Sequence, residues 1–154
     1  MPLAEGATLP DIELVATDGR RINLRDFSGR PLALYFYPKD DTPGCTREAR
    51  DFSELEREFC ALGCQVLGVS RDTPAKHRKF IDKYDLAVPL ATDDAGAATE
   101  AFGAWVEKRL YGRTYMGIDR STYLFDAAGV LVRTWRRVRV AGHAADVLDA
   151  ARKL

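Results

Sequence analysis

The feature that most constrains the fold is an uninterrupted apolar run at residues 32–37, LALYFY, which Pro38 ends. A run that is short, apolar at every position and rich in β-forming residues is typical of a strand covered on both faces. Such strands occur in α/β proteins, where helices pack on the two sides of a sheet. Residues 32–37 are therefore predicted to form a central strand of a layered α/β domain.

The segments around this run alternate between strand and helix patterns. Residues 12–16 and 21–24 flank Asp18-Gly19 and predict an N-terminal β-hairpin. The remaining chain predicts strands at 65–69, 88–91, 122–125 and 130–135, and helices at 46–62, 74–84, 95–102 and 144–153. This order predicts an α/β fold with a mixed central sheet flanked by helices, and crossovers followed by a late hairpin are what a thioredoxin-like sheet would show.

Length and charge limit the organisation and the partners of the chain. One domain over residues 1–154 is expected, because a domain usually takes roughly 100–200 residues. The 23 basic and 23 acidic residues give a formal net charge of zero, so no nucleic acid and no anionic membrane is expected as a partner. The longest apolar run, six residues, falls short of the ~20 that a membrane span needs.

The cysteines and histidines indicate the compartment and the cofactor status. Three cysteines, an odd number, and an N-terminus without a secretory pattern favour free thiols and a cytoplasmic location. His77 and His143 lack metal-ligand spacing and are expected at the surface or as helix caps. No haem, flavin or metal motif is present, so we expect no cofactor and no metal. Eight basic against two acidic residues within 108–139 predict a solvated face on an edge hairpin, with attraction of an anion as the alternative.

The segment that carries chemistry is YPKDDTPGCT, residues 37–46. Cys45 falls at the first turn of the predicted helix, where unsatisfied N–H groups and a partial positive charge favour a thiolate. Pro38, Pro43 and Gly44 shape the loop, and the Thr42 hydroxyl can both donate and accept beside the sulfur. The alternative is that Cys45 is a small buried apolar residue and Thr42 a turn or cap residue, but the polar neighbours of Cys45 are poor core residues.

The spacing Pro38-x-x-x-Thr42-x-x-Cys45 matches the active-site motif of the peroxiredoxins, which are thiol-dependent peroxidases with a thioredoxin-like fold. The blocks FYPKDDTPGCT, GVSRDTPAKHRKF and GRTYMGIDRSTYLFDAAG resemble the bacterioferritin comigratory protein (Prx Q) subfamily. This resemblance extends from about residue 9 to residue 154. It implies a monomer that reduces hydrogen peroxide and organic hydroperoxides.

The same resemblance assigns roles to four residues. Cys45 would be the nucleophile that attacks the peroxide and becomes a sulfenic acid. The Thr42 hydroxyl would hydrogen-bond the peroxide, and Pro38 would shield the pocket from water. Arg120, in GIDRSTYLF, would stabilise the thiolate and the charge that develops on the leaving oxygen. Without the resemblance, Arg120 would be taken for a structural ion-pair partner.

This chain departs from the subfamily at the second, resolving cysteine. Many members carry it at the position of Arg50 or near Ile81, and no cysteine is present at either place here. Cys60 and Cys64 remain as candidates, but fifteen helical residues separate Cys45 from Cys60 by ~22 Å, against a disulfide Cα–Cα reach of roughly 7 Å. Cys60 is expected to be partly exposed and Cys64 to be buried.

The sequence therefore predicts a 1-Cys mechanism in which an external thiol, such as thioredoxin, glutaredoxin or a small thiol, reduces the sulfenic acid. Three alternatives stay open: an atypical 2-Cys mechanism through Cys60 or Cys64, a redox sensor or holdase that uses oxidation of Cys45 as a switch, and a thiol–disulfide oxidoreductase. The last would require a C-x-x-C pair, which the segment around Cys45 lacks.

Overall fold

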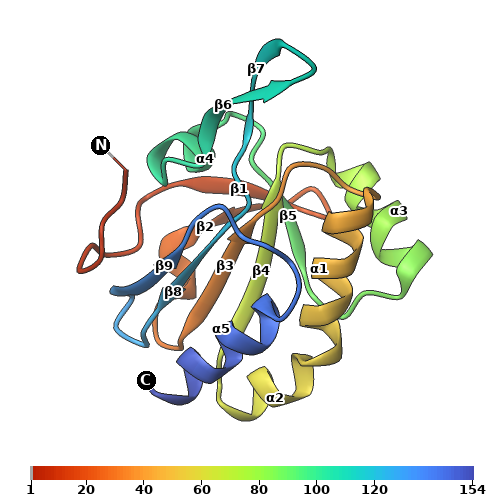
Figure 1. Ribbon diagram of the computed structural model, residues 1–154. Coiled ribbons are helices and arrows are strands. Elements are labelled where there is room, and N and C mark those ends of the chain that lie inside the picture. The colour runs from red at the N-terminus through yellow and green to blue at the C-terminus, as the bar shows by residue number, and fades with distance from the viewer. Residues whose placement is uncertain (1) are drawn as a thin grey trace.

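A seven-stranded mixed sheet forms the centre of the computed structural model, which describes residues 2–154 (Figure 1). The strand order is β2-β1-β5-β4-β3-β8-β9. β3 pairs in parallel with β4, and β4 with β5, while the other neighbours are antiparallel. The strands are β1 (Glu13–Ala16), β2 (Arg21–Asn23), β3 (Leu32–Phe36), β4 (Gln65–Ser70), β5 (Leu90–Thr92), β8 (Ser121–Phe125) and β9 (Leu131–Trp135).

Helices cover both faces of this sheet. One face packs against α1 (Pro43–Glu54), α2 (Glu56–Ala61), α3 (Pro74–Tyr84) and α5 (His143–Arg152). The other packs against α4 (Ala97–Ala101), the 3₁₀ turn η1 (Leu24–Phe27) and the N-terminal segment. The predicted α/β class with a mixed central sheet and an N-terminal hairpin is confirmed.

The central position of β3 follows from its sequence. Every residue of β3 is buried. Ala33 and Tyr35 belong to the core on the α1 side, and Leu32, Leu34 and Phe36 belong to the core on the opposite side. Because side chains of a strand alternate between faces, a strand apolar at every position serves two cores at once. The two cores therefore fix the position of β3, and with it the position at which the next loop begins.

The predicted helix over residues 46–62 is wrong in two respects. It begins three residues earlier, at Pro43, and it breaks into α1 and α2 at Leu55. At Leu55 the backbone leaves helical geometry, with φ −95° and ψ 3°. Beyond the break, Phe59 points into the same core as Phe52, and their ring centroids lie 6.0 Å apart. Leu62, assigned to the buried stripe by its spacing, is 39% exposed because the stripe no longer continues straight.

The expected surface positions of the two histidines are also wrong. His77 is completely buried and His143 is 4% exposed. Each ring has polar partners inside the protein: His77 contacts the Asp40 carboxylate, and His143 contacts the Thr122 hydroxyl at 2.7 Å. Burying a polar ring is tolerated when its nitrogens are hydrogen-bonded, and such pairings join residues far apart in sequence.

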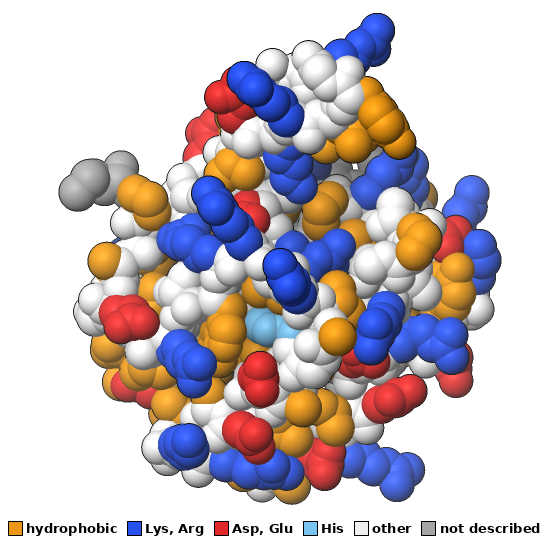
Figure 2. All heavy atoms as spheres, viewed as in Figure 1, with side chains coloured by type: hydrophobic (Ala, Val, Ile, Leu, Met, Phe, Trp, Pro, Cys, Tyr) orange, Lys and Arg blue, Asp and Glu red, His pale blue; other side chains and the backbone are white. Residues whose placement is uncertain are grey.

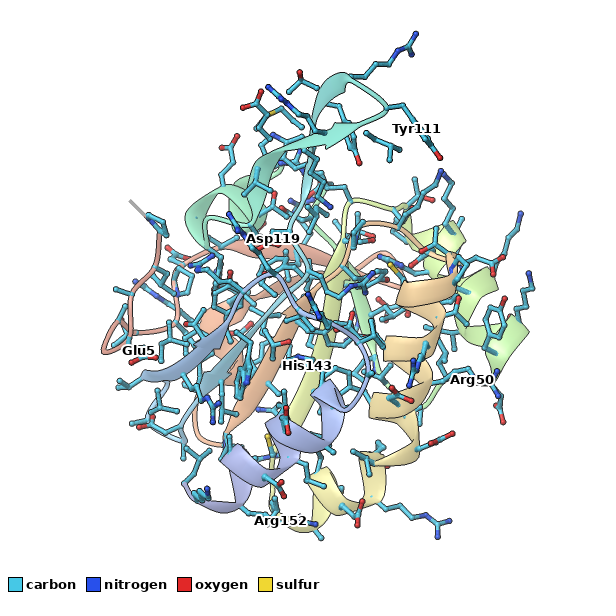
Figure 3. All side chains as sticks on the ribbon, in the orientation of Figure 1. Glu5, Arg50, Tyr111, Asp119, His143 and Arg152 are labelled. Atoms are coloured by element: carbon cyan, nitrogen blue, oxygen red, sulfur yellow. The ribbon has the colours of Figure 1, made fainter. Side chains whose placement is uncertain are left out.

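A second hairpin, β6 (Trp105–Leu110) and β7 (Arg113–Ile118), was not predicted from the sequence. It forms its own two-stranded sheet and projects from one end of the molecule, with Tyr111 at its tip (Figures 1 and 3). Tyr111 and Gly112 both have positive φ, 51° and 74°, as two-residue hairpin turns require. Gly112 was the available signal, but tyrosine is an unusual residue for the other turn position, and the strands are largely exposed.

Candidate active site

Cys45 lies in the first turn of α1, directly after the loop that follows β3. α1 begins with Pro43 at its first position and Thr42 as its N-cap residue. Proline suits this position because no intrahelical partner exists there for its missing N–H. The Cys45 side chain points toward the sheet and is 2% exposed, in the core with Tyr35, Ala49 and Phe52.

Arg120, between β7 and β8, brings a positive charge to this sulfur. Its Nη2 donates to Cys45 Sγ at 3.3 Å, and its Nη1 donates to Glu48 Oε1 at 2.7 Å. A planar guanidinium can hold two acceptors in fixed directions, which an ammonium group cannot. Gly44 leaves the space for this contact, since a Cβ there would lie 3.1 Å from Nη2. The predicted proximity of Arg120 to the sulfur is thus seen in the geometry.

Glu48 is a site residue that the sequence reasoning missed. It lies one turn after Cys45 and is 1% exposed. Burial raises its pKa to about 7, although the charge and hydrogen bond of Arg120 oppose the rise. Its second oxygen, Oε2, and the Tyr35 hydroxyl are the buried side-chain atoms without a hydrogen-bond partner within residues 2–154. The available signal was an acidic residue three positions after Cys45, on the face of α1 that carries Ala49 and Phe52.

Thr42 and Pro38 lie in the loop between β3 and α1. The Thr42 hydroxyl donates to the Lys39 carbonyl at 2.9 Å, while its own carbonyl accepts from the Thr46 N–H at 2.8 Å. The oxygen of that hydroxyl keeps its acceptor capacity. Pro38 is half-buried at the start of the loop. Cys45 and Arg120 are therefore in contact, and the Thr42 hydroxyl donates its hydrogen bond to the backbone of its own loop.

Further positive charge lies on the projecting hairpin. Burial lowers the pKa of Lys108 in β6, and the charge of Arg120 lowers it further, while Asp119 and the Cys45 sulfur oppose this shift. Figure 2 shows blue Lys and Arg side chains gathered on the hairpin and below it. Of the eight basic residues expected on a solvated face, Lys108 and Arg120 are instead half-buried, and the other six are exposed. Arg136, although exposed, also donates to the Phe102 carbonyl and the Tyr123 hydroxyl.

The two remaining thiols lie at the other end of the molecule. α1 begins at the end from which the hairpin projects, and α2 lies at the opposite end (Figure 1). Cys60 is exposed on α2, and Cys64 is buried just before β4, both as expected. They line one cavity of about 210 Å³ together with Arg30, Glu56 and other residues. Burial raises the pKa of Cys64 to about 11, and its Sγ faces the Gln65 carbonyl at 3.5 Å.

The register of the sheet explains this separation. Gln65, next to Cys64, pairs with Leu32 at the start of β3, whereas Cys45 follows the end of β3. The five residues of β3 span roughly 15 Å. α1 continues for nine residues after Cys45, which is about 14 Å along the helix. Cys60 lies beyond the end of α1, in α2. Arg50 lies on the outer side of α1 and is exposed (Figure 3).

The described residues, 2–154, contain no cluster of three or more histidine, cysteine or acidic side chains that could hold a metal ion. Among the same residues, no helix is long and apolar enough to cross a membrane. The fold and the site define a class of protein: a thioredoxin-fold protein with one buried thiol at a helix N-terminus, in contact with an arginine and without a C-x-x-C partner.

Comparison with known proteins narrows this class to one family. The AhpC/TSA family matches residues 6–134, and the chain belongs to that family, the peroxiredoxins. Peroxiredoxin Bcp of Bacillus subtilis is 42% identical over 154 residues, covering 100% of this chain and 98% of its own. Peroxiredoxin Bcp of Xanthomonas campestris is 46% identical over 140 residues, covering 91% of this chain and 88% of its own.

Solved structures agree with the family. The bacterioferritin comigratory protein of Xanthomonas campestris, described for its alkyl peroxide reduction activity, superposes with a TM-score of 0.90 at 42% identity, covering 97% of this chain and 98% of its own. A cysteine-to-serine variant of PrxQ from Xylella fastidiosa gives a TM-score of 0.93 at 35% identity, covering 99% of this chain and 98% of its own. The thioredoxin-like fold and the assignment as a peroxiredoxin enzyme are thereby confirmed.

Proposed function

We propose that this protein reduces hydrogen peroxide and organic hydroperoxides at Cys45, and that an external thiol completes the cycle. The Cys45 thiolate attacks one peroxide oxygen, so that an S–O bond forms while the O–O bond breaks. The leaving oxygen takes a proton and departs as water or an alcohol, and Cys45 becomes a sulfenic acid. The contact between Arg120 and the Cys45 sulfur, at 3.3 Å, carries this proposal.

The groups around Cys45 suit this step. The guanidinium of Arg120 and the N–H groups at the start of α1 supply positive charge both to a thiolate and to the departing oxygen. The Thr42 oxygen can accept a hydrogen bond from the peroxide while the Thr42 hydroxyl still donates to the Lys39 carbonyl. Glu48 holds the second half of the Arg120 fork and so fixes the direction of the first. Pro38, half-buried at the loop entrance, limits the access of water.

The second half of the cycle is proposed to use a thiol from another molecule. One thiol converts the sulfenic acid to a mixed disulfide and releases water, and a second thiol reduces this disulfide to regenerate Cys45. Cys60 and Cys64 are at the opposite end of the sheet, and the raised pKa of Cys64, about 11, leaves little thiolate to attack. Thioredoxin, glutaredoxin or a small thiol would act on a monomer in the cytoplasm.

Stopped-flow mixing with hydrogen peroxide tests the first half. We expect rapid stoichiometric oxidation of the wild-type protein and none at that rate in Cys45→Ser. Thr42→Val should slow the oxidation and Thr42→Ser should preserve it, since only serine keeps the hydroxyl. Slow oxidation of the wild type whose effects depend on a partner protein would instead favour the redox-sensor function.

Mass spectrometry of the oxidised protein tests the second half. With a thiol present, Cys45 should carry a mixed disulfide with that thiol. An intramolecular linkage from Cys45 to Cys60 or Cys64, formed in preference to the mixed disulfide, would show that the mechanism is of the 2-Cys type.

A further inference from the structure

A buried polar cluster lies behind the loop that precedes Cys45. The Asp40 carboxylate accepts from the Tyr37 hydroxyl at 2.5 Å, and its other oxygen lies 2.7 Å from His77 Nδ1. The side chains of His77 and Asp40 are 0% and 5% exposed. Asp40 belongs to the loop between β3 and α1, whereas His77 belongs to α3, so this contact joins the loop to a helix that carries none of the residues around Cys45.

The environment of His77 fixes how the ring bonds. Nε2 lies 3.0 Å from the Ala91 carbonyl of β5, while Nδ1 faces the Asp40 carboxylate. Both nitrogens therefore face oxygen atoms that can accept hydrogen bonds. A hydrogen bond to a carboxylate is stronger than a neutral one, and a buried acceptor that loses its donor is costly.

A second contact holds the same residue through its backbone. The Asp40 N–H donates to Asp72 Oδ2 at 2.9 Å, and the Ser70 hydroxyl donates to that oxygen at 2.7 Å. Two positions later the chain reaches Thr42, whose carbonyl accepts from the first turn of α1. Asp40 thus fixes the loop from within the core to β4, β5 and α3, two residues before Thr42.

We propose that His77 and Asp40 are positioning residues for the peroxidase cycle, an inference that rests on the proposed function. Their contact holds the loop in the conformation in which Cys45 meets Arg120, and this favours attack on the peroxide. The same contact opposes the second half of the cycle, because Cys45 is 2% exposed and its sulfur must move outward before another thiol can reach it. Loss of the contact therefore changes the two half-reactions in opposite directions.

Two substitutions of His77 separate its two hydrogen bonds. In His77→Asn the amide nitrogen can replace Nδ1 and keep the bond to Asp40, while the bond to Ala91 is lost. In His77→Gln the amide nitrogen can replace Nε2 and keep the bond to Ala91, while the bond to Asp40 is lost. Both variants remove one buried hydrogen bond, and His77→Gln, which loses the bond to the carboxylate, should lose more stability in urea unfolding.

The two half-reactions are measured separately by stopped flow, oxidation with hydrogen peroxide and reduction of the sulfenic acid with dithiothreitol. Loss of one charged hydrogen bond corresponds to about a tenfold change. We expect His77→Gln to oxidise about tenfold more slowly and to be reduced several-fold faster, with His77→Asn close to wild type in both. If His77→Gln fails to fold, Asp40→Asn weakens the same contact by removing the carboxylate charge, and it should change the two half-reactions in the same directions to a smaller extent.

Asp41→Asn is the matched control in the same loop. Asp41 accepts from Lys83 at 2.8 Å and from the Tyr84 hydroxyl at 2.6 Å, but Asp41 and Lys83 are exposed, at 42% and 58%, and exposed pairs contribute little. The side-chain oxygen of asparagine can still accept the bond from Tyr84. Asparagine also tolerates the left-handed φ of 59° at this position. Both half-reactions should stay at the wild-type rates.

The rate at which Ellman's reagent labels Cys45, in a Cys60→Ser background and without peroxide, measures how readily the loop opens. His77→Gln should expose Cys45 to the reagent faster than His77→Asn does. Equal labelling of the two variants, or half-reactions that fall together in both, would overturn the positioning role. A wild-type Cys45 that peroxide does not oxidise rapidly would overturn the proposed function, whatever the labelling shows.

Discussion

The smallest unit of the site is the fork of Arg120, which bonds to the Cys45 sulfur and to the Glu48 carboxylate at the same time. The two contacts are mutually dependent, because the pairing with Glu48 fixes the plane of the guanidinium that faces the sulfur. A side chain that supplied only a charge would leave one of the two acceptors without a donor. A side chain that supplied only hydrogen bonds would leave the sulfur without a nearby positive charge.

Substitution of Arg120 tests the fork. Arg120→Gln should oxidise with hydrogen peroxide on the order of 10²-fold more slowly, because a donor at the developing charge and the charge itself are lost. Arg120→Lys should fall between this variant and the wild type, since an ammonium keeps the charge but cannot hold both acceptors. Stopped-flow oxidation measures both, and equal rates in all three proteins would contradict the role assigned to Arg120.

Glu48 gives a prediction for the pH dependence of stability. Its pKa is about 7 in the folded protein, against 4.5 for a free side chain, so the folded state binds the proton more tightly. Its contribution to the free energy of unfolding therefore falls as pH rises from about 4.5 through about 7. Glu48→Gln removes this loss, so the variant should gain stability relative to wild type between pH 5 and pH 8 in urea unfolding. A difference that stays constant with pH would contradict the raised pKa.

At this scale, sequence reasoning identified the residues that carry the motif and missed those that act from within the core. Cys45 and Arg120 were predicted and lie in contact. Glu48 and His77 were not predicted to be buried partners, because amphipathic periodicity assigns polar residues to the surface. Their burial depends on partners from other elements, Arg120 and Asp40, and no local pattern encodes such pairings.

Among the elements, α5 is fixed to the rest of the fold through its first residue, His143 (Figure 3). Its ring packs edge-on against Phe52 of α1 and Trp135 of β9, with centroids 6.1 and 5.8 Å away. Its Nε2 lies 2.7 Å from the Thr122 hydroxyl of β8. One buried neutral ring thus connects α5 to α1 and to the sheet.

Acid should weaken this connection. Burial lowers the pKa of His143 to about 4, aided by the charge of Arg120 and opposed by Asp146, against 6.5 for a free side chain. The folded state therefore binds the proton less tightly, and the contribution of His143 to stability is lost as pH falls from about 6.5 to about 4. Compared with wild type, His143→Gln should become relatively more stable over that fall in urea unfolding. Because Glu48 acts in the opposite direction in this range, each variant is compared with wild type at the same pH.

Close packing between β4 and its neighbours gives a prediction for Gly68. A Cβ at this position would lie 2.6 Å from Tyr35 Cζ and 2.8 Å from Leu90 Cδ2, both in the core. Gly68→Ala should lower the free energy of unfolding by about 1–3 kcal/mol through overpacking. Gly117→Ala is the control, since its Cβ would meet the flexible Lys108 side chain at 3.3 Å. Equal urea midpoints for the two variants would contradict this account.

Buried elements were predicted more accurately than exposed ones. β3 is apolar throughout and was placed to within one residue of its observed end. The β6–β7 hairpin is mostly exposed, so neither strand has the apolar alternation that reveals a half-buried strand. The break at Leu55 was also invisible, because the apolar spacing of the helix continues across it.

In the whole molecule, strand order could not be read from the sequence, which supported only a mixed sheet. Insertion of β1 beside β5, and of β3 between β4 and β8, depends on contacts between distant segments. That arrangement supports the proposed 1-Cys mechanism, since parallel pairing of β3 with β4 places Cys45 and Cys64 at opposite ends of the sheet. The molecule thus has one thiol beside Arg120 and two thiols remote from it.

The most direct test of this account is turnover by the double variant Cys60→Ser/Cys64→Ser, with hydrogen peroxide as substrate and thioredoxin, glutaredoxin or dithiothreitol as reductant. The account predicts that the double variant, whose only thiol is Cys45, keeps the wild-type rate of peroxide consumption with whichever reductant supports the wild-type protein. A double variant that is oxidised once at Cys45 but no longer turns over would contradict it, because resolution would then require a thiol of this chain.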